Sequence, residues 1–313
     1  MRISVITPVY NGEKYIGETI NSVLNLISNS NIEYIVVDDG SSDNTSEILK
    51  KYSDKINVIT QFNQGESSAV NTGLSNARGD FVLVVSADDP LFTSEIFAGV
   101  EEYFDSNPNI VAWYPDWKMI DGEGKILKNV ITPEYSEEEL IGHFLCLPGP
   151  GTFFRRSAAI QIGGRRKNWK YVGDYDFWLR LSRIGDLARR AGVLAQWRFH
   201  DDSATVSNRG KEMYREQIGV IDEFLNNFQV SEKLSRMARA HALYFAAQLS
   251  FFSSEVKGRR TLFRAFQVRR GFVEGANIRV ILLLLTAPIP LFLQEFVQKN
   301  TVAKIRARKR GKI

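Results

Sequence analysis

Polar and acidic side chains occur at the points in this 313-residue chain where short apolar runs stop. Thr7 and Asn11 lie at the end of the first run, Asp38-Asp39 follows a second run, and Asp88-Asp89 follows a third. Grouped carboxylates are the ligands that hard divalent cations prefer in proteins. If these run ends meet in the fold, the sequence predicts an acidic pocket that a divalent cation neutralises.

The run ends meet if the runs are strands of a parallel sheet. In the first half of the chain, apolar β-branched runs alternate with amphipathic segments of helix length, a pattern typical of βαβ units. Parallel sheets bind ligands beyond the carboxyl ends of their strands, which is where the polar residues lie. The expected strands are 3–7, 34–37, 58–59 and 81–85, and the expected helices are 15–27, 45–51 and 67–77.

The second half of the chain is less regular and ends in helical patterns. We expect a hairpin turn, a Gly- and Pro-rich loop, an exposed basic and aromatic loop, and a final strand before an all-helical region that begins near residue 215. The segments in question are the turn 121–124, helix 137–144, loop 147–152, loop 165–169, helix 174–184, strand 193–199, and helices 218–228, 238–252 and 261–268.

The charge of the chain is concentrated at its C-terminal end. The formal net charge is +4, yet residues 299–313 alone carry seven Lys or Arg and no acid, so the preceding part is net acidic. This distribution argues against nucleic acid as a partner. The apolar stretch 280–293 is shorter than a spanning helix needs and is interrupted by Pro288 and Pro290. Together with the cations it predicts attachment to a membrane surface, with a buried helix and a solvated basic end as the alternative.

The cysteine content of the chain indicates its cellular compartment. Cys146 is the one cysteine, which excludes an internal disulfide and fits a reducing cytosol. We therefore expect a protein on the cytoplasmic, inner face of the cell membrane.

Seven segments in order resemble the family 2 glycosyltransferases, inverting enzymes with the GT-A fold, over roughly the first 210 residues. The segments are Thr7–Asn11, Val37–Thr45, Gln64–Gly73, Ala77–Asp80, Ser86–Asp89, Gly173–Arg180 and Arg198–His200. The resemblance implies a mostly parallel α/β sheet flanked by helices, with a helical extension. It divides the chain into a catalytic domain 1–215 (nucleotide-binding half 1–115, acceptor half 116–215), the extension 216–275, and a membrane-associating segment 276–313.

The resemblance also implies residues that bind the nucleotide and the donor sugar. In this family the second acid of the Asp38-Asp39 pair accepts from a ring N–H of the nucleobase; an Asp-Gly turn with a helix cap is the structural alternative for Asp39. The implied donor-side residues are Thr7, Pro8, Asn11, Asp39, Gln64, Asn71 and Asp88.

A cation, Mn2+ or Mg2+, is implied as cofactor. Asp88 and Asp89 are its candidate ligands, with His200 as a third that is as often structural in such a position. The usual Asp-x-Asp pattern is altered here, because Ser86 occupies its first position, so the ligating acid stays open between the two. A simple turn before Pro90 is the alternative.

The implied general base is Asp174, the second member of the family's Glu-Asp pair, whose first position holds Gly173 here. The base takes the proton of the acceptor hydroxyl as that oxygen attacks the anomeric carbon. A helix cap is the alternative for Asp174. Asp176 is a reserve candidate, or it pairs with Arg180 four residues on. The implied acceptor-side residues are Gly151, Thr152, Trp169 and Asp176.

These implications predict an inverting transferase that moves a sugar from a nucleotide-diphosphate donor, most often a UDP-sugar in relatives. The expected acceptor is a hydroxyl of a glycan or of a lipid-linked acceptor in cell-surface polysaccharide synthesis. Two alternatives are a nucleotidyltransferase of nucleotide-sugar synthesis and a non-catalytic nucleotide-binding or scaffold relative. The first would need a Gly-rich basic loop after the first strand, and residues 9–13 do not supply one. Ser86 and Gly173 keep the second open.

Overall fold

The chain divides into two compact units, Met1–Ser207 and Asn208–Ile313. The computed structural model describes residues 2–27, 32–200, 210–253 and 255–268. The observed division lies before the domain boundary that was expected after residue 215. Residue 215 falls inside the continuous helix Gly210–Asn227, and a helix stays within one unit because its hydrogen bonds run along its whole length. The candidate site residues all belong to the first unit.

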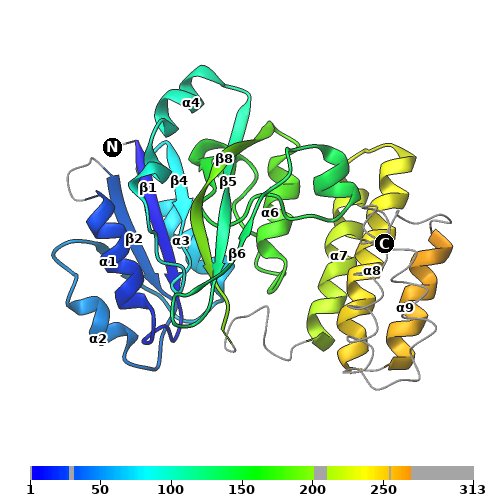
Figure 1. Cartoon of the computed structure of the whole chain (residues 1–313), viewed down its shortest axis with the longest axis horizontal. Coiled ribbons are helices and arrows are strands. Elements are labelled where there is room, and N and C mark those ends of the chain that lie inside the picture. The colour runs from blue at the N-terminus through cyan, green and yellow to red at the C-terminus, as the bar shows by residue number, and fades with distance from the viewer. Residues whose placement is uncertain (1, 28–31, 201–209, 254, 269–313) are drawn as a thin grey trace, which may run out of the picture. The chain divides into compact units, whose positions relative to one another are not determined.

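The first unit is built on one eight-stranded sheet (Figure 1) in the order β3-β2-β1-β4-β7-β5-β6, with β8 paired to β5. Its strands are β1 (Ile3–Val9), β2 (Ile32–Asp38), β3 (Asn57–Thr60), β4 (Phe81–Val84), β5 (Ile110–Ile120), β6 (Ile126–Val130), β7 (Phe153–Arg155) and β8 (Asp186–Arg198). Its helices are α1 (Ile16–Ile27), α2 (Thr45–Lys50), α3 (Glu66–Asn76), α4 (Val100–Ser106), α5 (Arg156–Gln161) and α6 (Gly173–Leu181), with a 3-10 turn η1 (Ser94–Phe97) and a π-helical turn η2 (Glu138–Gly142). The mostly parallel α/β fold is confirmed.

Strands β3, β2, β1 and β4 are parallel neighbours, so their carboxyl ends lie at one edge of the sheet. Strand β1 was expected to end before Pro8, but it continues to Val9. Its pairing with β4 stops at Ile6, whereas its pairing with β2 continues past Pro8. At Pro8 one side of β1 is therefore free, and the missing N–H of proline costs no ladder hydrogen bond.

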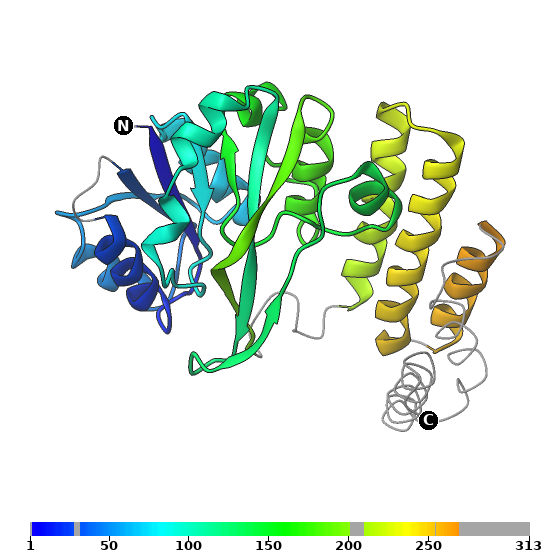
Figure 2. The same ribbon diagram turned by 45° about the horizontal axis from the view of Figure 1, so that its top comes forward.

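The other half of the sheet is organised by β5, the strand that β8 follows in parallel over its whole length (Figures 1 and 2). Strands β7 and β6 pair antiparallel with β5. The strand expected at 193–199 begins earlier in the structure, at Asp186. The residues before 193 are partly charged and have no apolar pattern, but they are a strand because they pair with β5. The expected helix 137–144 is a short π-helical turn.

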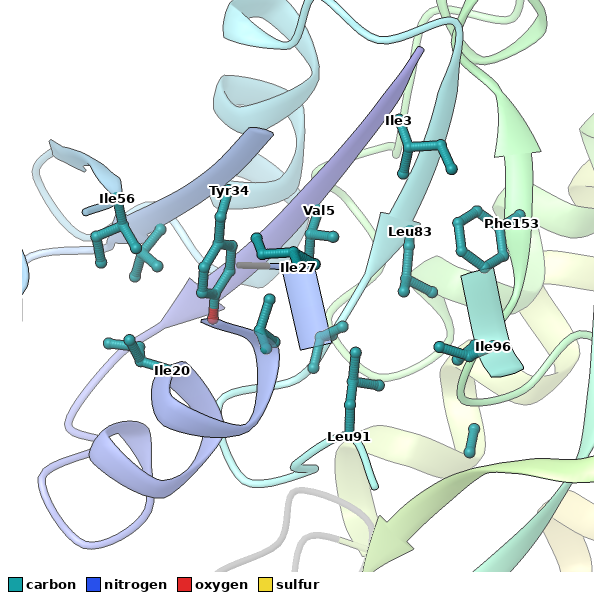
Figure 3. Packing of buried hydrophobic residues seen from close by; sticks show 14 of the residues in the cluster. Ile3, Val5, Ile20, Ile27, Tyr34, Ile56, Leu83, Leu91, Ile96 and Phe153 are labelled. Atoms are coloured by element: carbon teal, nitrogen blue, oxygen red, sulfur yellow. The ribbon is translucent and has the colours of Figure 1, made fainter. Parts of the chain in front are cut away.

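The core of this unit lies between α1 and the sheet (Figure 3). The apolar face of α1, spaced three and four residues apart, is buried against strand residues such as Val5, Tyr34 and Leu83. Ile20 and Ile27 of α1 point into this layer. This packing fixes the sheet, and with it the positions of the strand ends.

In the described part of the second unit, three helices pack side by side in sequence order (Figure 2): α7 (Gly210–Asn227), α8 (Glu232–Ser253) and α9 (Glu255–Val268). Each of them overlaps a segment where a helix was expected, and each begins at an earlier residue than predicted. Among the described residues, no helix combines the length and the apolar character that crossing a membrane requires. The expected membrane-associating segment 276–313 lies outside the described residues, so attachment through it stays a prediction.

Two glycines with positive φ allow a stability prediction about the Gly- and Pro-rich loop. Gly151 has φ 81°, and a Cβ there would lie 2.5 Å from Ala195 Cβ and 3.0 Å from Pro115 Cγ. Gly124 has φ 88°, and a Cβ there would have no neighbour within 4 Å. Both alanine variants carry the same left-handed strain, but only Gly151→Ala adds overpacking, which costs about 1–3 kcal/mol. We expect Gly151→Ala to lower the free energy of unfolding by roughly that amount more than Gly124→Ala in chemical denaturation; equal losses would contradict the packing of this loop.

Candidate active site

Asp39 joins the end of β2 to the loop that precedes α3. Its Oδ1 accepts hydrogen bonds from Gln61 Nε2 (2.6 Å) and from the backbone N–H of Gln64 (3.0 Å), and its Oδ2 accepts from the backbone N–H of Gly65 (2.7 Å). The side chain is 2% exposed. Asp39 therefore holds the loop before α3, and its predicted bond with a nucleobase stays a prediction.

The loops after β1 and β2 are bound to each other through Asn11. Its Oδ1 accepts from the backbone N–H of Ser42 (2.8 Å), and its own backbone N–H donates to Ser41 Oγ (3.0 Å). Asn11 has φ 51°, a left-handed conformation that Asn tolerates better than most residues. Asn11 thus shapes the carboxyl edge of the sheet, whatever contact it makes with a donor.

Thr7 and Pro8 lie within β1. The Thr7 side chain is fully buried, and its Oγ1 lies 3.0 Å from Tyr34 Oη, inside the core. This geometry does not support a ligand contact through the Thr7 side chain. The resemblance implied that Thr7 and Pro8 form a turn against the nucleotide, whereas both residues lie inside β1.

Asp88 and His200 face each other across the site. Asp88 Oδ2 lies 2.9 Å from His200 Nε2, and the two side chains are 30% and 12% exposed. The His200 ring packs at 5.0 Å from the Tyr15 ring of the segment before α1. A carboxylate and an imidazole in this arrangement are a donor pair that suits Mn2+. In the part of the chain that the structure describes, no third His, Cys, Asp or Glu joins them, so a cation held here would take its remaining ligands from phosphate oxygens or water.

Asp89 points elsewhere. Its Oδ1 accepts a 2.7 Å hydrogen bond from the backbone N–H of Arg198, and its side chain is buried. Burial, with the charge of Asp88 added, raises the pKa of Asp89 well above its usual value, although the bond from Arg198 opposes the shift. Of the two candidate acids, Asp88 is the one aimed at His200, while Asp89 anchors the end of β8.

Arg198 is fully buried, and it organises the acidic turn after β4. Its Nε donates to the Asp88 carbonyl (2.8 Å), its Nη1 to the Gly122 carbonyl (3.0 Å) and its Nη2 to Glu18 Oε2 (2.8 Å). The guanidinium carbon also lies 4.7 Å from the centre of the Tyr15 ring. One side chain thus fixes α1, the acidic turn and the β5–β6 hairpin together.

Asp174 lies in the first turn of α6, with part of its side chain open to solvent. Its Oδ1 accepts from the backbone N–H of Tyr175 (2.7 Å), and Cys146 Sγ lies 4.0 Å from its Oδ2. The surrounding protein withholds water from the carboxylate and raises its pKa; the Arg165 charge lowers this pKa and the Glu66 charge raises it. A carboxylate with a raised pKa that solvent can still reach is suited to accept a proton.

The basic loop before α6 is fastened to α3. Asn71 Nδ2 donates to the Arg165 carbonyl (2.7 Å), and Asn71 Oδ1 accepts from the Arg165 backbone N–H (2.8 Å). Arg165 Nη1 pairs with Glu66 Oε1 (2.8 Å), and Lys167 Nζ donates to Gln64 Oε1 (3.0 Å). Gln64 and Asn71, predicted as donor-side residues, therefore also hold this loop and place Arg165 beside the proposed base.

The predicted acceptor-side residues differ in accessibility. Asp176 is buried, and its Oδ2 pairs with Arg180 at 2.8 Å, the alternative that the spacing allowed. Gly151 and Thr152 are buried too, and Thr152 Oγ1 donates to the Gly149 carbonyl (2.7 Å). Trp169 is half-buried. Asp176, Gly151 and Thr152 support the site from within, so their contact with an acceptor stays a prediction.

Contacts between segments bring the main acids to one region. Gly12, in the loop after β1, lies against Ala87 of the acidic turn, and the backbone N–H of Asp39 donates to the Val9 carbonyl (2.8 Å). Asp39 binds the N-terminus of α3, and the neighbouring Glu66 and Arg165 act on Asp174. The acids therefore do not scatter over different faces, which is the arrangement that would have excluded a common site.

Sequence reasoning missed three contributors to this site. The sequence placed Arg198 only within a segment that matches the family. A charged residue at the end of an apolar strand could have indicated that its side chain is buried and bound to other polar groups. Tyr15 and Cys146 gave no signal, because their contacts with His200 and Asp174 join segments far apart in the chain.

Comparison with known proteins identifies the family of this chain. The model for glycosyl transferase family 2 matches residues 4–163. An uncharacterised glycosyltransferase of Rickettsia typhi is 30% identical over 250 residues, which cover 76% of this chain and 76% of the relative. The chondroitin synthase of Escherichia coli is 30% identical over 187 residues, 58% of this chain but 27% of that longer protein.

Solved structures share the fold. S. aureus TarS 1–349 in complex with UDP-GlcNAc has a TM-score of 0.60 at 22% identity, covering 86% of this chain and 81% of that one. The mannosyltransferase PcManGT from Pyrobaculum calidifontis, in complex with GDP-Man and Mn2+, has a TM-score of 0.57 at 13% identity, covering 96% and 79%. With a family model that matches half of its length and a relative at 30% identity over most of both chains, the protein belongs to glycosyl transferase family 2.

Proposed function

We propose that this glycosyltransferase moves a sugar from a uridine diphosphate donor to a hydroxyl group of a glycan acceptor, with inversion at the anomeric carbon. The observation that carries the proposal is Asp174: a solvent-accessible carboxylate with a raised pKa, at the start of a helix and tied through Arg165 and Glu66 to the strand-end edge that carries Asp39. The UDP-GlcNAc complex of TarS supports the donor class, and the similarity to a chondroitin synthase supports a glycan acceptor.

In the proposed reaction, the acceptor oxygen forms a bond with the anomeric carbon as the bond from that carbon to the diphosphate oxygen breaks. Asp174 Oδ2, the carboxylate oxygen that does not accept from Tyr175, takes the acceptor proton. Tyr175 orients the carboxylate by donating its backbone N–H to the other oxygen. Arg165 and Glu66, held beside the base, set its proton affinity with opposite charges.

Asp88 and His200 are the residues that would hold a cation, and Mn2+ in the PcManGT complex supports the choice of ion. When bound, a divalent cation neutralises charge on the diphosphate leaving group. For the acceptor we propose a lipid-linked or polymeric glycan at a membrane surface, a proposal that depends on the basic segment 299–313.

The first prediction concerns the base. Asp174→Asn should reduce slow donor hydrolysis, measured as UDP release from UDP-GlcNAc, by about 10²–10⁴-fold, because an amide cannot accept the proton. Stabilisation by UDP in a thermal-shift assay should persist. The matched control is Asp186→Asn, an exposed carboxylate at the start of β8, which should hydrolyse the donor at the parent rate. Full hydrolysis by Asp174→Asn would remove Asp174 from this role.

The second prediction concerns pH. Because the surrounding protein withholds water from the Asp174 carboxylate and raises its pKa, and because the base works deprotonated, activity should fall as pH drops through a value above that of an ordinary Asp. Removing the nearby cation in Arg165→Met should move this acid limb of kcat/KM to higher pH, since Arg165 favours the charged carboxylate. Glu66→Gln should move it to lower pH. The backbone bonds from Asn71 keep the loop in place in both variants. Shifts in the same direction for both variants would contradict this electrostatic assignment.

The third prediction concerns the cation. Arg198→Met should weaken Mn2+ binding, measured by electron paramagnetic resonance with UDP present, by about 10–100-fold, because the residue that fixes the Asp88 segment is lost. Glu18→Gln keeps a hydrogen-bond acceptor for Arg198 at the exposed rim and should change Mn2+ affinity far less. If both variants bind Mn2+ like the parent protein, Asp88 and His200 do not depend on Arg198 for their placement.

A further inference from the structure

An aromatic cluster lies on one face of the β5–β8 pair, in the half of the sheet expected to face the acceptor. Trp117 pairs in register with Ala195, and Met119 with Trp197. The Trp117 and Trp197 ring centres are 6.1 Å apart, and those of Trp197 and Phe199 are 6.0 Å apart. Side chains alternate along a strand, so these three rings share a face, while Lys118, Gln196 and Arg198 point to the other.

The two faces have different surroundings. On the polar face, Gln196 Nε2 donates to the Pro90 carbonyl (2.6 Å) and Arg198 Nε to the Asp88 carbonyl (2.8 Å), so this face packs on the acidic turn. On the aromatic face lies the Gly- and Pro-rich loop, since a Cβ at Gly149 would be 3.1 Å from Trp117 Nε1. The structure thus assigns a separate environment to the rings.

The same loop connects the rings to the proposed base. Cys146 Sγ lies 4.0 Å from Asp174 Oδ2, and Gly149, three residues later, contacts Trp117. Three peptide units span at most about 11 Å. The cluster therefore begins within one or two sugar units of the carboxylate that would receive the acceptor proton.

The geometry of the rings suits a sugar. Both ring pairs meet edge to face, at 84° and 69°, so only the edge of one ring lies against the flat face of its neighbour and the rings do not stack face on face. Both tryptophans are half-buried and Phe199 is 41% exposed. A pyranose has an apolar face of C–H groups that packs on an aromatic ring, while its hydroxyl groups stay in water at the rim.

We propose that Trp117, Trp197 and Phe199 form a subsite for a pyranose unit of the acceptor glycan, adjacent to the unit that receives the transferred sugar. The assignment rests on the proposed function, because the position of Asp174 distinguishes the acceptor side from the donor side. The donor nucleotide is expected beyond the ends of β1, β2 and β4, in the other half of the sheet. The subsite would select for glycan rings and would leave donor binding unaffected.

The test uses saturation-transfer NMR on the 313-residue chain with UDP, Mg2+ in place of the paramagnetic Mn2+, and four probes: the methyl β-glycosides of glucose, galactose, N-acetylglucosamine and glucuronic acid. We expect saturation transfer to UDP and to at least one glycoside. Phe199→Leu and Trp197→Leu should each weaken glycoside binding by roughly ten-fold, the size expected when an aromatic face is lost, with UDP signals unchanged. Phe199→Tyr keeps the ring and should keep the glycoside signals.

The matched control is Phe92→Leu. Phe92 is 39% exposed, close to Phe199, but it packs under Lys118 Nζ at 3.5 Å on the polar face. This variant should retain the glycoside signals.

Wild-type protein that binds UDP but none of the four glycosides, or Leu variants that bind glycosides like wild type, would overturn the subsite. Loss of UDP signals from wild-type protein would instead contradict the proposed donor, so the two failures are distinguishable. Phe199 is exposed at the end of β8, so its Leu variant remains informative if Trp197→Leu fails to fold.

Discussion

The arrangement of the site depends on one buried charged side chain, the guanidinium of Arg198. Arg198 has 1% of its surface exposed, and its guanidinium donates to three different segments: the acidic turn, the β5–β6 hairpin and α1. Burying a guanidinium is costly unless its donors are used, and here each nitrogen has an acceptor. Because two of these acceptors are backbone carbonyls, the residue fixes the course of the chain rather than only a side chain. The position of Asp88 relative to His200 follows from this fixation.

The basic loop before α6 shows the same principle with weaker interactions. Asn71 binds both backbone groups of Arg165, so the loop is placed by an amide side chain that carries no charge. The charges of Arg165 and Glu66, which pair with each other at 2.8 Å, then act on Asp174 from fixed positions. Preorganised charges of this kind cost no reorganisation when a proton moves. Placement and electrostatic tuning are thus carried by different residues, which is why the tuning can be altered without losing the loop.

Much of this arrangement could be predicted from the sequence, and the limits have physical causes. Apolar runs and turn residues located β1, β2 and β4 and put Asp39 and Asp88 at their ends, because strand periodicity and strand-end acids are local signals. The extension of β1 past Pro8 could not be predicted, since it depends on β4 leaving the pairing first. The same holds for β8, whose charged first half is a strand only because β5 pairs with it. The contacts of Thr7 with Tyr34 and of Cys146 with Asp174 join distant segments, and no local pattern encodes them.

Strand alternation explains how β8 serves two parts of the site at once. Residues at even positions, Gln196 and Arg198, are buried and hold the acidic turn through backbone carbonyls. Residues at odd positions, Trp197 and Phe199, turn to the opposite face, where the loop that reaches Asp174 lies. A shift of one residue in the β5–β8 register would exchange the two sets, placing a guanidinium among the rings and an aromatic ring against the Asp88 carbonyl. The register is therefore constrained from both faces, and the proposed cation-side and acceptor-side parts of the site cannot move independently.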